Sequence, residues 1–119
     1  MRLRKTFLVS ALSMLMISLT GCTDSVEMLK KDLSSTDVGT RLRAINSLGD
    51  MGSKASSTVP TLIDIVRRDS DMACRRAAAR ALGRIGERAA IQPLKDVQSA
   101  ANDGGLQREI KDALAKLKE

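Results

Sequence analysis

The residues of this chain best suited to chemistry are two cysteines, Cys22 and Cys74, because the 119-residue sequence contains no histidine. Without imidazole there is no Ser–His or Cys–His pair and no histidine metal site. On a helical wheel Cys74 falls on the apolar side with Ala78 and Leu82, where a cysteine packs as a small hydrophobic residue. We therefore predict a buried thiol at Cys74, no catalytic residue, no metal site and a protein that is not an enzyme.

Cys22 follows a segment with the parts of a secretory signal. A basic start at residues 2–5 precedes an apolar run at residues 7–19, which is shorter than the ~20 residues needed to span a bilayer. The run ends in Leu19-Thr20-Gly21-Cys22, which resembles the lipobox of bacterial lipoprotein precursors. The resemblance implies cleavage before Cys22 and acylation of its thiol. The alternative is an ordinary signal peptide with a cysteine near its cleavage site.

The lipobox resemblance divides the chain into three parts. Residues 1–21 are a cleaved signal peptide, residues 22–24 are the lipidated cysteine and a short tether, and residues 25–119 are the folded domain. It implies an anchor in a bacterial cell membrane through acyl chains such as palmitate, the only non-protein group we expect. In enterobacterial lipoproteins an Asp directly after the lipidated Cys retains the protein in the inner membrane. Here Thr23 follows Cys22, which favours the periplasmic side of the outer membrane if the organism is Gram-negative.

The segment at residues 37–52 recurs 34 residues later, at 71–86, with Asp, Arg, Ala, Leu and two Gly at equivalent positions. The segment at 59–65 recurs at 91–97, and a third partial copy runs from 103 to 118. Repeats of this length are typical of helical arrays. The pattern Asp-x₃-Arg-x₂-Ala-x₃-Leu-Gly-x₂-Gly resembles the short HEAT-like repeats of the phycobilisome-lyase type. Tetratricopeptide repeats need aromatic residues and ankyrin repeats need a histidine, and neither is present in these segments.

The apolar periodicity predicts an all-α protein, a short α-solenoid of HEAT-like helical hairpins with about six helices. Asp37 and Asp71 stand at N-cap positions, and Gly52 and Gly86 stand where a left-handed residue ends a helix. The core must consist of Leu, Ile, Val, Ala and Met, because Phe7 is the only aromatic residue. The helices are expected at 25–34, 38–50, 59–68, 72–85, 90–101 and 105–118.

Arg41 and Arg75 occupy the same position of the repeat. In the families that this pattern resembles, that arginine ties neighbouring repeats together through carboxylates in the loops. The resemblance therefore implies a structural role for both residues, with Asp37, Asp69 and Asp71 as candidate partners.

A stripe of arginines on the fourth predicted helix does not follow the repeat. On a helical wheel Arg76, Arg80 and Arg84 face away from the core, and Arg88 continues the series past the turn. Their counterparts in the preceding repeat are the unlike residues Leu42, Asn46 and Asp50, so the repeat pattern does not require them. The stripe is either a solvated helix face or a surface that meets anions such as phospholipid headgroups, lipopolysaccharide phosphates or cell-wall acids.

The second helix of each hairpin offers another candidate surface. Repeat arrays bind proteins along a concave wall of such helices. Asp64 and Asp96 recur at one repeat position and could suggest a catalytic pair of carboxylates. A solenoid, however, places equivalent residues of successive repeats side by side in any case, so their proximity does not indicate catalysis. The residues expected to form this wall are Thr61, Ile63, Asp64, Lys95, Asp96 and Gln98.

These features lead to three hypotheses. The first is a membrane-anchored envelope lipoprotein that acts as a non-catalytic protein-interaction or scaffold module for an unidentified envelope protein. The second is electrostatic binding of anionic lipid or polysaccharide by the arginine stripe. The third, with the least support in the sequence, is a subunit of a chromophore-lyase-like enzyme. The net charge of +6 also suits nucleic acid, but export from the cytoplasm argues against that partner.

We predict that the Cys22→Ser precursor is not processed as a lipoprotein and carries no acyl chains, because the substitution removes the thiol that would be acylated. Mass spectrometry of the membrane-bound protein checks this, with inhibition of the lipoprotein signal peptidase as the control that leaves the precursor uncut. A mature N-terminus at any residue other than Cys22 contradicts the prediction.

Overall fold

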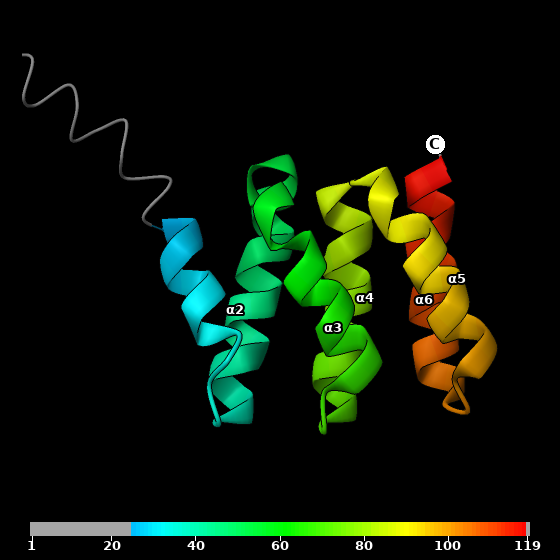
Figure 1. The fold of residues 1–119 in the computed structure, drawn as a ribbon, viewed down its shortest axis with the longest axis horizontal. Coiled ribbons are helices and arrows are strands. Elements are labelled where there is room, and N and C mark those ends of the chain that lie inside the picture. Colours follow the sequence, from blue (N-terminus) through cyan, green and yellow to red (C-terminus); the bar gives the residue numbers. More distant parts are fainter. Residues whose placement is uncertain (1–24, 119) are drawn as a thin grey trace, which may run out of the picture.

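The computed structural model describes residues 25–118, and within them every regular element is a helix. A first helical segment covers residues 25–32, and the following elements are labelled in Figure 1. They are α2 (Val38–Met51), η1 (Gly52–Thr58), α3 (Val59–Arg68), α4 (Met72–Ile85), η2 (Arg88–Ala90), α5 (Ile91–Ala100) and α6 (Gly104–Lys118). The predicted all-α class and helix ranges are confirmed. The predicted signal peptide, Cys22 and the tether lie outside the described residues.

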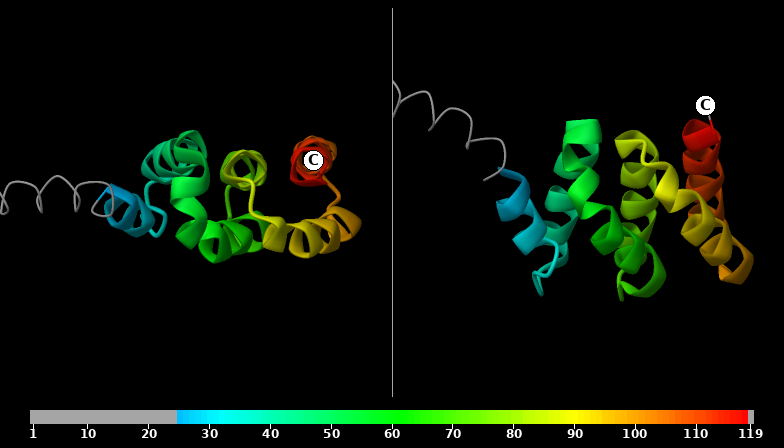
Figure 2. Two further views of the ribbon diagram at one scale, coloured as in Figure 1. Left: turned by 90° about the horizontal axis from the view of Figure 1, so that it is seen from above. Right: turned by 45° about the horizontal axis from the view of Figure 1, so that its top comes forward.

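The helices form two layers, which Figure 2 shows from above. The first layer contains α2, α4 and α6, and the second contains the segment at 25–32 together with α3 and α5. Each hairpin therefore contributes one helix to each layer, as the solenoid prediction requires. The helix at residues 25–32 and α6 lie at opposite ends of the row (Figure 1).

The helix ends follow from the polar residues and glycines at the turns. Asp37 and Asp71 have extended backbones, and their carboxylates accept hydrogen bonds from the backbone N–H of Thr40 at 2.8 Å and of Cys74 at 3.0 Å. Both predicted N-caps are confirmed. Gly86 is left-handed, with φ 84° and ψ 13°. Gly52 has φ 58° but ψ −135°, so it is not the left-handed residue that we predicted, and the chain turns there into η1.

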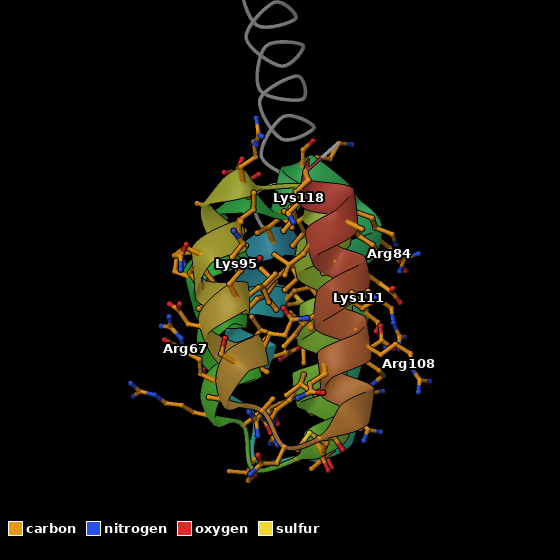
Figure 3. The ribbon with its side chains drawn as sticks, turned by 90° about the vertical axis from the view of Figure 1, so that its right-hand side faces the viewer. Arg67, Arg84, Lys95, Arg108, Lys111 and Lys118 are labelled. Carbon is orange, nitrogen blue, oxygen red and sulfur yellow. The ribbon has the colours of Figure 1, made fainter. Side chains whose placement is uncertain are left out.

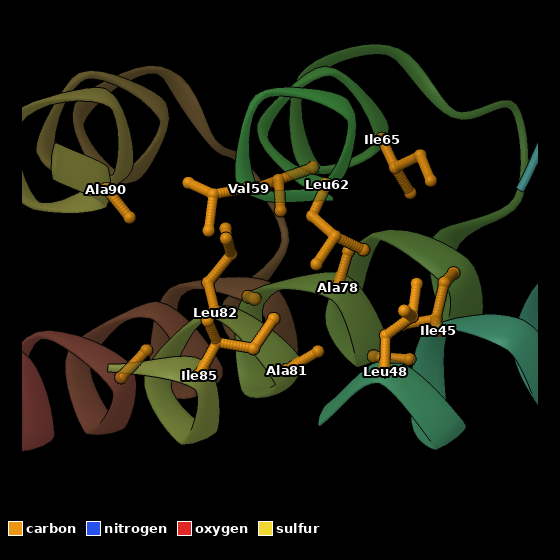
Figure 4. Packing of buried hydrophobic residues seen from close by; sticks show 14 of the residues in the cluster. Ile45, Leu48, Val59, Leu62, Ile65, Ala78, Ala81, Leu82, Ile85 and Ala90 are labelled. Atoms are coloured by element: carbon orange, nitrogen blue, oxygen red, sulfur yellow. The ribbon is translucent and has the colours of Figure 1, made fainter. Parts of the chain in front are cut away.

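The core lies between the two layers and is made of Leu, Ile, Val, Ala and one Cys. Ile45, Leu48, Leu62 and Leu82 have no exposed surface. Figure 4 shows Leu62 of α3 pointing toward Ala78 of α4, across the space between the layers. Methionine contributes less than we expected, because Met51 and Met72 are only partly buried and Met28 is 68% exposed.

Two glycines set the spacing of the first layer. A Cβ atom on Gly83 would lie 2.9 Å from the Cα of Ala113, and one on Gly49 would lie 3.2 Å from the Cα of Ala81. No ordinary side chain fits at the first distance, and the second is tighter than normal contact. The Leu-Gly pair of the repeat therefore combines a buried leucine with a point where neighbouring helices approach backbone to backbone.

We predict that Leu48→Ala and Leu82→Ala each destabilise the fold by ~2–5 kcal/mol, because both leucines are fully buried and the truncation leaves a cavity. Thermal unfolding followed by far-UV circular dichroism measures this, since residues 22–119 contain no aromatic reporter. The matched control is Met28→Ala, at an exposed apolar position. Unchanged melting of both leucine variants contradicts this description of the core.

Candidate interaction surface

The cysteine that the structure describes is not a reactive group. Cys74 is fully buried in α4, and desolvation raises the pKa of its thiol, with the negative charge of Asp69 acting in the same direction. The predicted burial is confirmed. Within residues 25–118 no three Cys, Asp or Glu side chains come together in a way that would hold a metal ion.

Arg41 ties two loops together, as predicted. Its Nε and Nη2 donate to the two carboxylate oxygens of Asp69 at 3.0 and 2.9 Å, and its Nη1 donates to the carbonyl of Ser35 at 2.8 Å. The side chains of Arg41 and Asp69 are only 11% and 6% exposed. This two-pronged pair joins the loop before α2 to the loop before α4, and the hydrogen bond to Asp69 raises the pKa of Arg41.

Arg75 does not repeat this arrangement, which corrects our prediction. Its Nε donates to the backbone carbonyl of Val66 at 2.7 Å rather than to a carboxylate. Asp103 lies 34 residues after Asp69 and would be the equivalent partner. It is bound instead by Arg76, through Nε at 3.0 Å and Nη2 at 2.6 Å.

A glycine allows Arg76 to take this partner. A Cβ atom on Gly105, at the start of α6, would lie 2.7 Å from the guanidinium carbon of Arg76. The guanidinium of Arg76 therefore lies over the backbone of Gly105, where it binds Asp103.

The arginine stripe is exposed, as predicted, but its charges are used within the fold. The side chains of Arg76, Arg80 and Arg84 are 42%, 51% and 47% exposed, and each forms an ion pair. Arg80 holds both oxygens of Glu109 on α6, the shorter contact being 2.8 Å, and Arg84 reaches Asp50 on α2 at 2.8 Å. The sequence analysis placed no carboxylate beside these arginines, and the structure shows that their partners belong to the neighbouring repeats.

The pairs perturb the carboxylates that accept them. The hydrogen bond from Arg76 lowers the pKa of Asp103, helped by the N–H of Leu106, and the hydrogen bond from Arg80 lowers the pKa of Glu109. A carboxyl whose pKa is lower in the folded chain adds stability above its unfolded pKa, about 4. That stability is lost as the pH falls through the lowered folded value.

The remaining predicted residues lie at the surface without ion pairs among the described residues. Arg88 is exposed in η2, Asp64 is exposed on α3, and Lys95 and Asp96 are exposed on α5, where Asp96 accepts a hydrogen bond from Gln92 at 3.0 Å. Ile63 is partly buried against the core. Their role as a binding wall stays a prediction.

The last helix carries exposed basic residues at the C-terminal end of the row. Figure 3 shows this end, with Arg108 and Lys111 on α6 and Lys95 on α5 projecting outward. None of these side chains forms an ion pair with a described residue, and all are exposed. The outer face of the last helix is therefore polar, as the terminal repeat of a helical array requires.

Two adjoining hollows lie where α4 meets α5 and the loop before α6, and sequence reasoning predicted neither of them. They have volumes of about 430 and 260 Å³ and share Arg75, Ala100 and Ala101 as lining residues. The larger is completed by Met72, Asn102, Asp103 and Leu106, and the smaller by Arg67, Asp96 and Val97. The sequence does contain a sign that Arg75 lacks a carboxylate partner. A second arginine, Arg76, follows it directly, and two glycines follow Asp103 directly.

Comparison with known proteins identifies the family. The model of HEAT repeats matches residues 26–115, so the chain belongs to the HEAT-repeat family. A search of curated protein sequences finds no match. No described helix has the length and apolar character that crossing a bilayer requires.

Two solved structures contain similar folds. One is the complex of CpcE and CpcF of phycocyanin lyase from Nostoc sp. PCC7120, with 30% identity and a TM-score of 0.72 over 79% of this chain and 37% of that one. The other is an epoxyqueuosine reductase, with 27% identity and a TM-score of 0.61 over 66% of this chain and 20% of that one. The chain thus spans well under half the length of either protein.

Proposed function

We propose that this HEAT-repeat protein is a non-catalytic interaction module that uses its second layer to bind another protein of the bacterial envelope. One observation carries the proposal. The three outward arginines of α4, Arg76, Arg80 and Arg84, form ion pairs inside the fold, whereas the exposed charged side chains of α3 and α5 form no ion pair with a described residue. Repeat arrays bind partners along helical faces of this kind. The similar lyase structure, which is a complex of two proteins, supports a protein partner.

The non-catalytic part of the proposal rests on the available side chains. The chain has no histidine, Cys74 is buried, and Asp64 and Asp96 lie exposed without an adjacent acid, base or metal site among the described residues. The lyase and the reductase favour the opposite hypothesis, an enzyme subunit. Against it, the similarity covers only 37% and 20% of those chains, so it does not carry their activities across.

Membrane anchoring is the second part of the proposal. It is supported by the lipobox-like Leu19-Thr20-Gly21-Cys22, which stands three residues before the first described helix at residue 25. Two or three acyl chains on Cys22 would anchor the protein firmly. We place it on the periplasmic side of the outer membrane if the organism is Gram-negative, because Thr23 rather than Asp follows the cysteine.

Binding of anionic lipid or polysaccharide is the second candidate function, and it would use a surface other than the arginine stripe. Three of the four predicted arginines are paired, so the basic side chains without an ion pair to a described residue toward the C-terminal end are Arg88, Lys95, Arg108 and Lys111. Others, among them Lys31 on the first helix, lie elsewhere. The C-terminal end is opposite the helix at 25–32, which the lipid tether would hold near the membrane (Figure 1). Charges at the far end are poorly placed for headgroups of the same bilayer, because salt screens them within ~8–10 Å.

The test is purification of the lipidated protein from its own envelope after mild crosslinking. We expect one stoichiometric protein partner, and we expect the charge reversals Asp64→Arg and Lys95→Glu on the second layer to reduce its capture at least about fivefold, since like charges facing each other suppress association. The matched control is Lys116→Glu, an exposed residue of α6 in the first layer, which should capture the partner as well as the wild type does.

Two results would count against the interaction module. Copurification of lipid or polysaccharide without a protein would favour the anionic-surface hypothesis. Equal loss of the partner with Lys116→Glu and with the second-layer variants would show that the partner does not bind through α3 and α5.

A further inference from the structure

Arg75 is the repeat arginine whose hydrogen-bond donors the fold uses only in part. Its Nε donates to Val66, and neither Nη atom has a hydrogen-bond partner among residues 25–118. In the equivalent Arg41 all three nitrogens donate hydrogen bonds, to the carboxylate of Asp69 and to the carbonyls of Ser35 and Thr36. The difference arises because Arg76 has taken Asp103.

The unused side of Arg75 faces open space. Arg75 lines both hollows, of about 430 and 260 Å³, together with the end of α5 at Ala100 and the following Ala101. The two first-layer interfaces, α2 with α4 and α4 with α6, are packed closely, whereas α3 and α5 touch only sparingly.

We propose that Arg75 is the centre of a site that binds the carboxylate of an Asp or Glu side chain from a protein partner. This inference rests on the proposed function and names the chemistry of its partner. The fold itself shows which group fits, because Arg41 at the equivalent position holds a planar carboxylate with two parallel hydrogen bonds. A guanidinium fork matches that geometry better than a point charge does.

The lining of the hollows favours a singly charged group on an apolar stem. Two positive side chains, Arg67 and Arg75, stand near two negative ones, Asp96 and Asp103. A phosphate, with up to two negative charges, would be repelled by these carboxylates more strongly than a single carboxylate would. Apolar lining for the stem comes from Met72, Val97, Ala100, Ala101 and Leu106.

The test is an NMR titration with two tripeptides whose termini are blocked, acetyl-Ala-Glu-Ala-amide and acetyl-Ala-Gln-Ala-amide. Inorganic phosphate is titrated in parallel. The protein begins at residue 22 and carries Cys22→Ser, and it keeps the core that the structure describes, whose buried apolar residues run from Val26 to Leu117. We expect the Glu peptide to shift the Arg75 Nε–H and the Ala101 amide with saturation. The Gln peptide should bind about tenfold more weakly, as expected when a charge-assisted bond is lost.

Variants separate the site from general attraction to positive charge. Arg75→Gln, and Arg75→Lys if the first fails to fold by circular dichroism, should abolish the preference for the Glu peptide. The matched control is Arg68→Gln, an exposed residue at the end of α3 that lines neither hollow, and it should bind the Glu peptide as the wild type does. The Nε–H of Arg41 should not move, since its donors are already occupied.

Several outcomes would overturn the inference. These are equal binding of the two peptides, an unchanged preference in the Arg75 variants, tighter binding of phosphate than of the Glu peptide, or no saturable shift up to about 10 mM peptide. If the envelope partner is captured equally well by Arg75→Gln, this inference fails while the interaction module stands. If the Glu peptide is preferred but no envelope partner is found, the site stands while the proposed function fails.

Discussion

The close approach of α2, α4 and α6 is the constraint on which the rest of the structure depends. Gly49 and Gly83 permit it, because a Cβ atom at either position would press against the next helix. A chain without aromatic residues in this region fills its core with small and branched aliphatic side chains, and close helix contact keeps such a core free of voids. The first layer is therefore the closely packed side of the solenoid.

Charge pairing follows from this spacing. With neighbouring helices so close, side chains from α4 span to both sides, so Arg84 reaches Asp50 on α2 and Arg80 reaches Glu109 on α6. Arg76 reaches Asp103 over the bare backbone of Gly105. The charges of the three outward arginines of α4 are thus balanced locally. The second layer, which is packed less closely, keeps its charges open to a partner.

Much of the architecture could be predicted from the sequence because the relevant signals are local or periodic. The caps Asp37 and Asp71, the apolar stripes and the 34-residue recurrence gave the helices and their hairpins. Asp69 was one of three candidate partners for the repeat arginines and is the one that Arg41 binds, and Cys74 was placed in the core. The backbone of Gly52 was not predicted, because positive φ leaves ψ free to differ from the left-handed value seen at Gly86.

The interaction surface was predicted less well because it depends on contacts between repeats. A helical wheel shows that Arg76, Arg80 and Arg84 face outward, but it shows nothing of the carboxylates on adjacent helices. Asp103 is bound by Arg76 rather than by Arg75, and a helical wheel of one helix does not show this contact with the start of the next. The hollows, in turn, are lined by residues of α3, α4, α5 and α6 together, which no single helix pattern brings into view.

The measurement that tests the central claim most directly is the melting temperature of the triple variant Arg76→Gln, Arg80→Gln, Arg84→Gln, compared with a charge-matched control, Arg67→Gln, Arg68→Gln, Arg88→Gln. If the first-layer arginines tie the repeats together, the first variant melts several degrees below the wild type at neutral pH while the control does not. The difference in melting temperature shrinks as acid protonates Asp103 and Glu109, because the ion pairs with Arg76 and Arg80 lower the pKa of these two carboxyls. Equal melting of both variants and the wild type at neutral pH would contradict the account, because the stripe would then be only a solvated face.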